Sequence, residues 1–213
     1  MTRFADVMLS IVFLILVSPL LLTTALLLRF TGEGEVFFSQ ERIGKHGAVF
    51  QVLKFATMLK DSPNLGLGTI TEANDPRILP VGKVLRATKL NELPQFINVI
   101  RGEMSIVGPR PLAEADLKGI PPADMEVIKT MPPGLTGVGS IIFRDEERIL
   151  HTQASPRDFY DSIIAPYKAS LECWAATKMN IFFYFTMIIT TVAVVLIPPL
   201  KSILYYLYKD MPQ

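Results

Sequence analysis

The residues best suited to chemistry lie in one segment, residues 86–111, which reads RATKLNELPQFINVIRGEMSIVGPRP. Two polar oxygen donors, Asn91 and Glu92, stand side by side just before Pro94. The Glu92 carboxylate could attack an electrophile or hold a metal ion, and Asn91 offers an amide oxygen. This pair is therefore the candidate reactive centre of the chain.

Cations surround the pair in the sequence. Between residues 76 and 110 there are two acidic residues, Glu92 and Glu103, and six basic ones: Arg77, Lys83, Arg86, Lys89, Arg101 and Arg110. The whole chain has a net charge of only +1, so the local excess does not follow from a basic composition. A carboxylate among arginines and lysines is typical of a site for phosphorylated substrates. The alternative is a helix start with ordinary solvated charges.

Hydrophobic residues are concentrated near the two ends of the chain. Its 213 residues suit one domain, and half of them are hydrophobic. Residues 7–28 and residues 179–200 carry no charged side chain. Each run is long enough for a helix to cross a hydrocarbon layer of roughly 30 Å. We therefore predict a membrane protein, and we expect the first run to be retained because it lacks a clear small-residue cleavage site.

The first apolar run carries Ser18-Pro19 at its middle. A proline there removes a backbone hydrogen bond and clashes with the carbonyl four residues earlier, so the helix must kink or break. A kinked helix would cross the membrane, whereas a break would give a re-entrant hairpin that leaves by the face it entered. The residues alone leave both geometries open.

Local patterns predict the elements that must position the charged segment. Aromatic and β-branched residues on both sides of the turn at 45–47 predict a hairpin over residues 36–58. Helices are predicted at 81–89, 93–101, 123–130 and 159–178, a short strand at 104–107, a rigid turn at 108–111 and a flexible loop at 134–139. Asn91 and Glu92 would then lie at the start of a helix, and the turn would fix Arg110.

Six motifs along the chain resemble those of one family. They are VFFSQERIG, KFATM, DPRI, VGKVLR, LNELPQFINVIRGEMSIVGPRP and PGLTG, in this order. On these motifs the chain resembles the bacterial monotopic phosphoglycosyl transferases over roughly residues 6–178. The Ser18-Pro19 pair within the apolar run is part of the resemblance.

The resemblance implies a fold and a location. The fold is a membrane-associated α/β (α+β) one. It has a re-entrant membrane helix at 1–29 broken at Ser18 and Pro19, a small mixed catalytic domain at 30–178, and a C-terminal apolar or interfacial helix and tail at 179–213. The implied location is the bacterial inner membrane, with the catalytic domain on the cytoplasmic face. Whether residues 179–200 span the membrane or lie on it is left open.

The resemblance also implies a reaction. A sugar-1-phosphate moves from a UDP-sugar to undecaprenyl phosphate, with Mg²⁺ as cofactor, giving the undecaprenyl-diphosphate-sugar and UMP at the first membrane step of polysaccharide biosynthesis. The expected partners are the lipid, the UDP-sugar and the membrane. We expect no nucleic-acid partner, and a homo-oligomer is left open. The sugar and the glycan are not fixed by any motif.

Site residues follow from the same resemblance. The catalytic centre maps onto Glu92, Asn91 and Lys54, with Glu92 and Asn91 as metal ligands. Lys54 would lie near Glu92 and keep its carboxylate ionised. Phosphate or substrate contacts map onto Arg86, Arg110 and Arg144. Arg110 is the best preorganised of these, because flanking prolines restrict its backbone.

The chain departs from the family pattern at Asn91, where the family has the aspartate on which a phosphosugar-enzyme intermediate is taken to form. A carboxamide is a poor nucleophile and a weaker Mg²⁺ ligand. Three explanations stay open: Glu92 is the nucleophile, the lipid phosphate attacks directly, or the chain is a silent homologue that binds lipid phosphate or nucleotide sugar. A phosphohydrolase that uses water as acceptor is a further alternative. A second departure is Ala56, where the family usually has an arginine.

Overall fold

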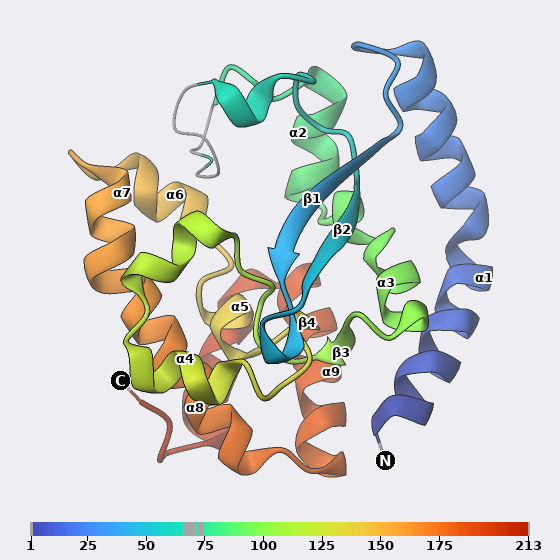
Figure 1. Ribbon diagram of the computed structural model, residues 1–213. Helices are drawn as coiled ribbons and strands as arrows, with labels where there is room; N and C mark the ends of the chain where they lie inside the picture. The colour runs from blue at the N-terminus through green and yellow to red at the C-terminus, as the bar shows by residue number, and fades with distance from the viewer. Residues whose placement is uncertain (1, 66–70, 72–74, 213) are drawn as a thin grey trace.

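The computed structural model of the protein describes residues 2–65, 71 and 75–212 and combines many helices with two small sheets (Figure 1). The strands are β1 (Phe37–Ile43), β2 (Val49–Phe55), β3 (Ser105–Val107) and β4 (Gly134–Thr136). The α-helices are α1 (Thr2–Phe30), α2 (Pro80–Ala87), α3 (Gln95–Arg101), α4 (Pro122–Ile128), α5 (Val138–Ile142), α6 (Glu146–His151), α7 (Pro156–Phe159), α8 (Ala165–Lys178), α9 (Ile181–Leu196) and α10 (Ile203–Leu207). Short helical turns are η1 (Lys45–Gly47), η2 (Ser62–Asn64), η3 (Leu90–Glu92), η4 (Glu114–Gly119), η5 (Tyr160–Ile164) and η6 (Pro198–Ser202). The prediction of a mixed fold is confirmed.

Strands β1 and β2 form the predicted hairpin. They are antiparallel, with Phe37 opposite Phe55 at the open end and Ile43 opposite Val49 next to the turn. In that turn His46 has a φ of 57° and Gly47 a φ of 78°, the left-handed region in which a chain reverses tightly. The hairpin crosses the middle of the molecule (Figure 1) and presents one face to the site described below.

Strands β3 and β4 are parallel and lie in the buried core. The prediction of a flexible loop over 134–139 is therefore wrong, because β4 and the start of α5 occupy these residues. Glycines made the segment look like a loop, yet here they allow two backbones to touch. A Cβ atom on Gly134 would lie 2.2 Å from the backbone nitrogen of Gly108. Glycine is needed for this approach and not for flexibility.

The predicted helices are confirmed with shifted ends. Helix α2 lies within 81–89 except for its first residue, and α3 lies within 93–101. The predicted helix at 159–178 is a continuous run of α7, η5 and α8. Gly102, with a φ of 91°, ends α3 in the left-handed conformation usual after a helix.

Helix α1 continues through Ser18 and Pro19, so the expected re-entrant hairpin is not shown. Pro19 has no N–H to donate to the carbonyl of Ile15, four residues earlier. The Ser18 hydroxyl donates to that carbonyl instead, at 2.8 Å. This side chain replaces the missing backbone bond, which explains how a helix that contains a proline stays continuous.

A buried carboxylate holds α1 to the rest of the fold. Asp6 is 2% exposed and accepts hydrogen bonds from the Ser105 hydroxyl (2.9 Å), the Ile106 backbone N–H (2.9 Å) and the Tyr184 hydroxyl (2.7 Å). These three donors come from β3 and α9, more than 90 residues away in the sequence. One polar side chain thus ties the N-terminal helix to the central strand and to the C-terminal helix.

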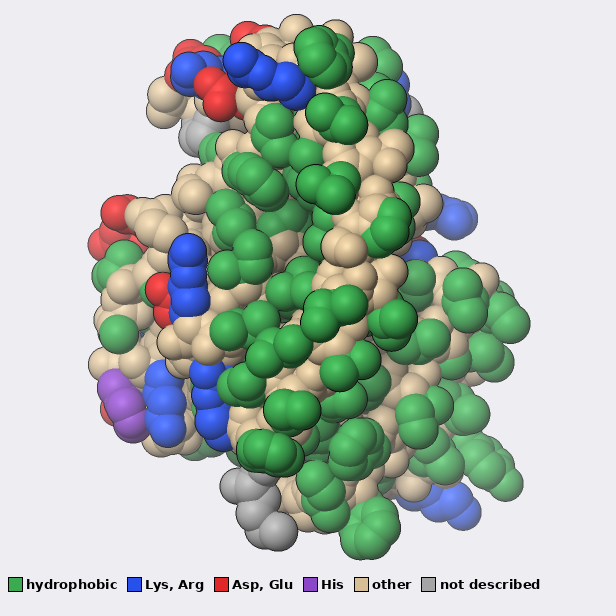
Figure 2. All heavy atoms as spheres, turned by 90° about the vertical axis from the view of Figure 1, so that its right-hand side faces the viewer, with side chains coloured by type: hydrophobic (Ala, Val, Ile, Leu, Met, Phe, Trp, Pro, Cys, Tyr) green, Lys and Arg blue, Asp and Glu red, His purple; other side chains and the backbone are tan. Residues whose placement is uncertain are grey.

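Helices α1 and α9 both expose apolar side chains. Figure 2 shows hydrophobic side chains over most of the face that α1 presents, and α1 is the helix among the described residues that is long and apolar enough to cross a membrane. Helix α9 has 16 residues and buries Phe183, Tyr184 and Met187 against the domain while it exposes Phe182 and Leu196. At about 1.5 Å per residue it is shorter than a roughly 30 Å hydrocarbon layer.

Replacing Asp6 by Ala leaves three buried donors without an acceptor, and we expect this to lower the free energy of unfolding by about 1–3 kcal/mol. Thermal unfolding of the detergent-solubilised protein measures the loss. The control is Thr186→Ala, because the Thr186 hydroxyl bonds only to the Phe182 carbonyl of its own helix. Equal melting temperatures for the two variants would show that Asp6 does not anchor α1.

Candidate active site

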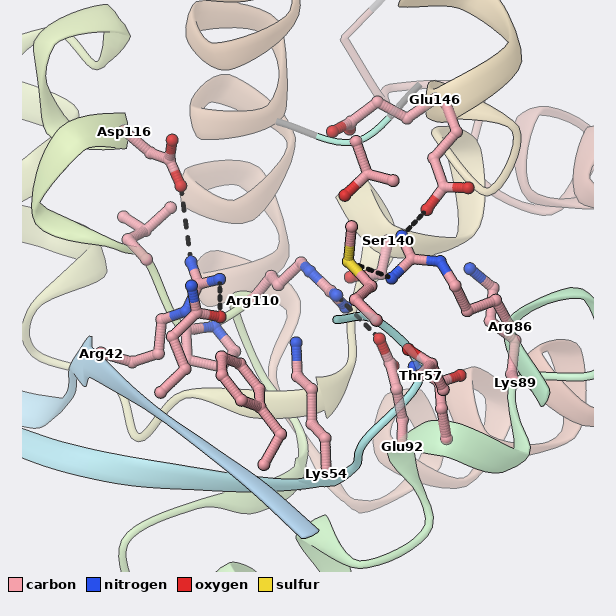
Figure 3. Close-up of a pocket in the computed structure, with 18 of the residues that line it drawn as sticks. Arg42, Lys54, Thr57, Arg86, Lys89, Glu92, Arg110, Asp116, Ser140 and Glu146 are labelled. Carbon is pink, nitrogen blue, oxygen red and sulfur yellow. Dashed lines mark hydrogen bonds and ion pairs between the residues drawn. The ribbon is translucent and has the colours of Figure 1, made fainter. Parts of the chain in front are cut away.

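A cavity of about 480 Å³ lies between the hairpin, η3 and helices α5, α6 and α8. Five of the six site residues predicted from the sequence line it: Lys54, Arg86, Asn91, Glu92 and Arg110. They come from β2, from the neighbouring elements α2 and η3, and from the turn after β3. Figure 3 shows the labelled side chains of Lys54, Glu92 and Arg110 directed toward a common space.

The turn η3 places Asn91 and Glu92 between α2 and α3. Lys89, just before it, has a φ of 62°, an uncommon conformation for a residue with a side chain. This reversal is closed by a hydrogen bond from the Glu92 N–H to the Lys89 carbonyl. The chain then enters α3 through Pro94, in line with the sequence prediction that the pair precedes a helix.

Glu92 and Arg110 form the central ion pair of the cavity, with Nη2 of Arg110 2.8 Å from Oε1 of Glu92. Burial alone would raise the pKa of Glu92, but Arg110, Lys54 and Lys89 outweigh it and hold this pKa well below the usual range. Glu92 in turn raises the pKa of Arg110. The carboxylate is therefore ionised at neutral pH although little of it reaches solvent.

Lys54 lies on β2 beside this pair. Burial and the positive charge of Arg110 lower its pKa to about 7, although Glu92 acts in the opposite direction. A lysine in this state changes its charge near neutral pH. The expectation that Lys54 keeps Glu92 ionised agrees with its electrostatic effect on the pKa of Glu92.

Arg86 reaches the cavity from α2. Gly82 allows α2 to approach the segment that follows β2, since a Cβ at this position would lie 2.1 Å from the Thr57 carbonyl oxygen. The Arg86 guanidinium forms an ion pair with Glu147 of α6, and its buried Nε has no hydrogen-bond partner among the described residues. One N–H of this arginine thus has no hydrogen-bond partner within the described part of the chain.

Further cations in the cavity wall, among them Arg42 and Lys89, were not assigned from the sequence. Arg42 of β1 donates to Gln40 at 2.6 Å and to Asp116 at 3.4 Å. Burial and Arg110 lower its pKa. Lys89 also lines the cavity. The signal for Arg42 was its position in the motif VFFSQERIG, where every second residue of the strand faces one side.

The structure does not bring Arg144 to this cavity wall. Its Nη2 donates to the Val195 carbonyl, near the end of α9, at 3.4 Å. Its neighbour Asp145 pairs with Lys201 of η6. Arg144 thus contacts the C-terminal helical region, whereas the sequence analysis expected it to contact phosphate.

The donor set around Glu92 fits a Mg²⁺ ion that also binds substrate phosphates. The described residues contain no group of three or more His, Cys, Asp or Glu side chains that could hold a metal ion by themselves. However, the Asn91 Oδ1 atom is buried and has no hydrogen-bond partner among them, and the Glu92 carboxylate is its neighbour. Mg²⁺ is usually held by one or two protein oxygens together with water and phosphate oxygens. Asn91 and Glu92 offer such a set.

Comparisons with known proteins identify relatives of the chain. A family model described as bacterial sugar transferase matches residues 1–198. The exopolysaccharide production protein ExoY of Rhizobium meliloti (strain 1021) is 40% identical over 158 residues, which cover 68% of this chain and 70% of that protein.

Two relatives carry names that state a reaction. The UDP-glucose:undecaprenyl-phosphate glucose-1-phosphate transferase of Escherichia coli (strain K12) is 47% identical over 53% of this chain and 24% of that protein. The undecaprenyl-phosphate galactose phosphotransferase of Salmonella typhimurium (strain LT2) is 35% identical over 68% of this chain and 33% of that protein. The matches thus cover a third or less of these two longer proteins.

Lys54 predicts a pH dependence of anion binding. Because its folded pKa is about 7, we expect the affinity of the metal-free protein for pyrophosphate to fall as the pH rises through 7. The fall between pH 6 and pH 8 should reach up to about tenfold if the anion requires the charged lysine. Calorimetric titration in EDTA measures it. Lys54→Arg keeps its positive charge over this pH range and is the control. Any pH dependence that remains in this variant comes from protonation of pyrophosphate itself. The same pH slope in both proteins would show that Lys54 is not responsible.

Glu172 of α8 predicts a pH dependence of stability. It is 6% exposed, and Oε1 accepts the Gly139 N–H at 2.9 Å. Burial raises its pKa from 4.5 to about 7, against the Gly139 bond and Lys168. Between pH 4.5 and pH 7, Glu172 therefore takes up a proton when the protein folds. The resulting contribution to the free energy of unfolding is fully present below pH 4.5 and is lost as the pH rises through 7.

Glu172→Gln removes this proton uptake. We expect the variant to equal the wild type at low pH and to exceed it in stability by an amount on the order of a few kcal/mol above pH 7. Denaturant unfolding at a series of pH values measures the difference. A constant difference between the two proteins across that range would contradict the raised pKa.

Proposed function

The chain belongs to the bacterial sugar transferase family, and from this premise we propose that it transfers a sugar-1-phosphate from a UDP-sugar to undecaprenyl phosphate. The products are the undecaprenyl-diphosphate-sugar and UMP. The observation that carries the proposal is the ionised Glu92 carboxylate, held by Arg110 at 2.8 Å in a cavity that Lys54, Arg86 and Lys89 also line. Such a cavity suits a diphosphate next to an oxygen nucleophile.

The cations bind and orient the diphosphate. Arg110 offers a planar guanidinium fixed by Pro109 and Pro111, and Arg86 has an unpartnered buried N–H. Guanidinium groups bind phosphate through parallel hydrogen bonds, and lysines add point charges. Their charge also stabilises the negative charge that develops on the transferring phosphoryl group and on the departing UMP.

Glu92 acts as the nucleophile in the proposed chemistry. One carboxylate oxygen attacks the phosphorus that bears the sugar, and the bond from that phosphorus to the bridging oxygen breaks. UMP leaves with the electron pair. An oxygen of undecaprenyl phosphate then attacks the same phosphorus, and the bond to Glu92 breaks and restores the carboxylate. Because Glu92 is already ionised, the first step needs no base to activate it, and Glu92 leaves as a carboxylate in the second.

Asn91 and Glu92 would hold the Mg²⁺ ion that the family resemblance implies. When bound, the ion neutralises the diphosphate and stabilises the leaving group. The amide oxygen of Asn91 is a neutral ligand, so this chain relies more on the phosphate oxygens of the substrate for metal affinity than a site with two carboxylates does.

The membrane is the proposed location, because undecaprenyl phosphate does not leave it. Apolar side chains exposed on α1 and α9 support insertion of this face (Figure 2). We further propose that the site lies at the cytoplasmic face of the inner membrane, with α1 in a re-entrant geometry based on Ser18 and Pro19. The enzyme then meets its lipid by lateral diffusion.

Release of UMP by the detergent-solubilised protein, with Mg²⁺, undecaprenyl phosphate and a panel of UDP-sugars, tests the proposal. We expect release that requires both the lipid and Mg²⁺. Glu92→Gln should lower it by roughly 10³-fold or more, because the amide is a poor nucleophile. Release of about one UMP per protein molecule without lipid indicates the covalent intermediate.

Other outcomes separate the alternatives. Release that needs lipid even in the first turnover indicates direct attack by the lipid phosphate. Continuous release without lipid indicates a phosphohydrolase. No release by the wild type but release by Asn91→Asp identifies a silent homologue and overturns the proposal. Each variant is compared only if its melting temperature matches that of the wild type.

A further inference from the structure

The cavity has a second end that the proposed chemistry does not use. Its polar side chains include Ser140 of α5, Glu146 of α6, Tyr160 of η5, and Lys168 and Glu172 of α8. Figure 3 shows the labelled Ser140 and Glu146 across the cavity from the strand that carries Lys54. The two ends are neighbours, since the charge of Glu146 contributes to the raised pKa of Arg110 after that of Glu92.

Charges at this second end are matched, unlike those near Glu92. Lys168 forms an ion pair with Glu146, and its Nζ lies 5.5 Å from the Phe143 ring centroid and 5.7 Å from that of Tyr160. The Lys168 charge is offset by that of Glu146, whereas Lys54, Lys89 and Arg110 together exceed the single negative charge of Glu92. The pair instead presents a hydrogen-bond donor next to an acceptor, with an aromatic ring beside them. This combination suits a neutral ring that carries hydroxyl groups.

Ser140 provides an independent sign of a missing ligand. Its Oγ atom is buried in the cavity wall and has no hydrogen-bond partner among the described residues. An unpaired buried hydroxyl costs folding free energy, so such groups usually have a partner in the functional state. A ligand hydroxyl in this end of the cavity would supply it.

The second end of the cavity is more enclosed than the opposite end, and this favours the sugar over the nucleotide as the group that it binds. The second end is walled by the buried residues Leu150, Ala165 and Ala169. The opposite end of the cavity opens between exposed residues, among them Leu59 and Lys60. UMP must leave while the sugar-phosphate stays for the lipid, so the retained group belongs in the enclosed end and the departing group in the open one.

We propose that Ser140, Glu146 and Lys168 form a subsite that binds the hydroxyl groups of the donor's sugar and thereby sets which UDP-sugar is accepted. The subsite rests on the proposed function for its choice of ligand. Tyr160 forms the apolar side of the subsite, on which one face of the sugar ring packs. The three polar side chains come from three different helices, so small shifts among them would change the sugar.

Equilibrium binding tests the subsite without requiring turnover. Affinities for UDP and for UDP-glucose, UDP-galactose, UDP-N-acetylglucosamine and UDP-N-acetylgalactosamine are measured by calorimetry on the solubilised full chain with Mg²⁺. We expect the wild type to bind one of these UDP-sugars more tightly than UDP. Ser140→Ala should weaken binding of that UDP-sugar by roughly 3- to 10-fold and leave the affinity for UDP unchanged. Glu146→Gln should alter the order of preference among the four sugars.

Ser39→Ala is the matched control, because Ser39 lines the same cavity from β1 but is exposed and lies outside the subsite. It should change none of the affinities. Ser140→Ala should also not lower the melting temperature, since it removes an unpaired hydroxyl.

Three results would overturn the subsite. If Ser140→Ala weakens the binding of UDP and of the UDP-sugar equally, the nucleotide lies at Ser140 in place of the sugar. Unchanged affinities in both Ser140→Ala and Glu146→Gln leave no role for these side chains in binding. A wild type that does not distinguish UDP-sugars from UDP has no sugar subsite. Sugar-selective binding without UMP release would overturn the transfer reaction alone and leave the subsite intact.

Discussion

The contact between Glu92 and Arg110 is the interaction on which the rest of the site depends. A carboxylate with so little exposure stays ionised only when cations offset its loss of hydration. The fold supplies them from segments far apart in sequence: Lys54 from the hairpin, Lys89 from the turn before η3, and Arg110 from the turn after β3. The hairpin and the parallel β3–β4 pair matter to function because they bring these charges to one carboxylate.

The same fold also joins the site to the apolar surface. Ser105 and Ile106 of β3 hold α1 through Asp6, and β3 leads directly into the turn that carries Arg110. The position of the apolar helix is therefore fixed relative to Arg110 by a few residues of one strand. A substrate with an apolar tail and a phosphate head requires this kind of fixed relation between an apolar surface and a cationic cavity.

Much of this could be predicted from the sequence where the signal is local. The hairpin, α2, α3 and the gathering of cations around Glu92 follow from short patterns. The segment 134–139 could not be predicted, because its glycines indicate a loop unless the backbone of β3 is known to lie against them. Arg42 was missed because the alternation along its strand shows which residues share a face but not which face meets the cavity. Arg144 was expected to contact phosphate. In the structure it contacts Val195 of α9, and this contact depends on tertiary packing that no sequence motif indicates.

Asn91 makes the cavity more positive than a carboxylate at the same position would. A carboxylate at this position would add a negative charge next to Glu92, and two neighbouring carboxylates favour a metal ion while they repel phosphate. The amide removes that charge but keeps an oxygen, whose buried Oδ1 has no partner among the described residues. The cavity of this chain is thus more positive than one with a carboxylate pair. In the proposed reaction, the cations of this cavity would contribute more to holding the diphosphate than its metal ligands would.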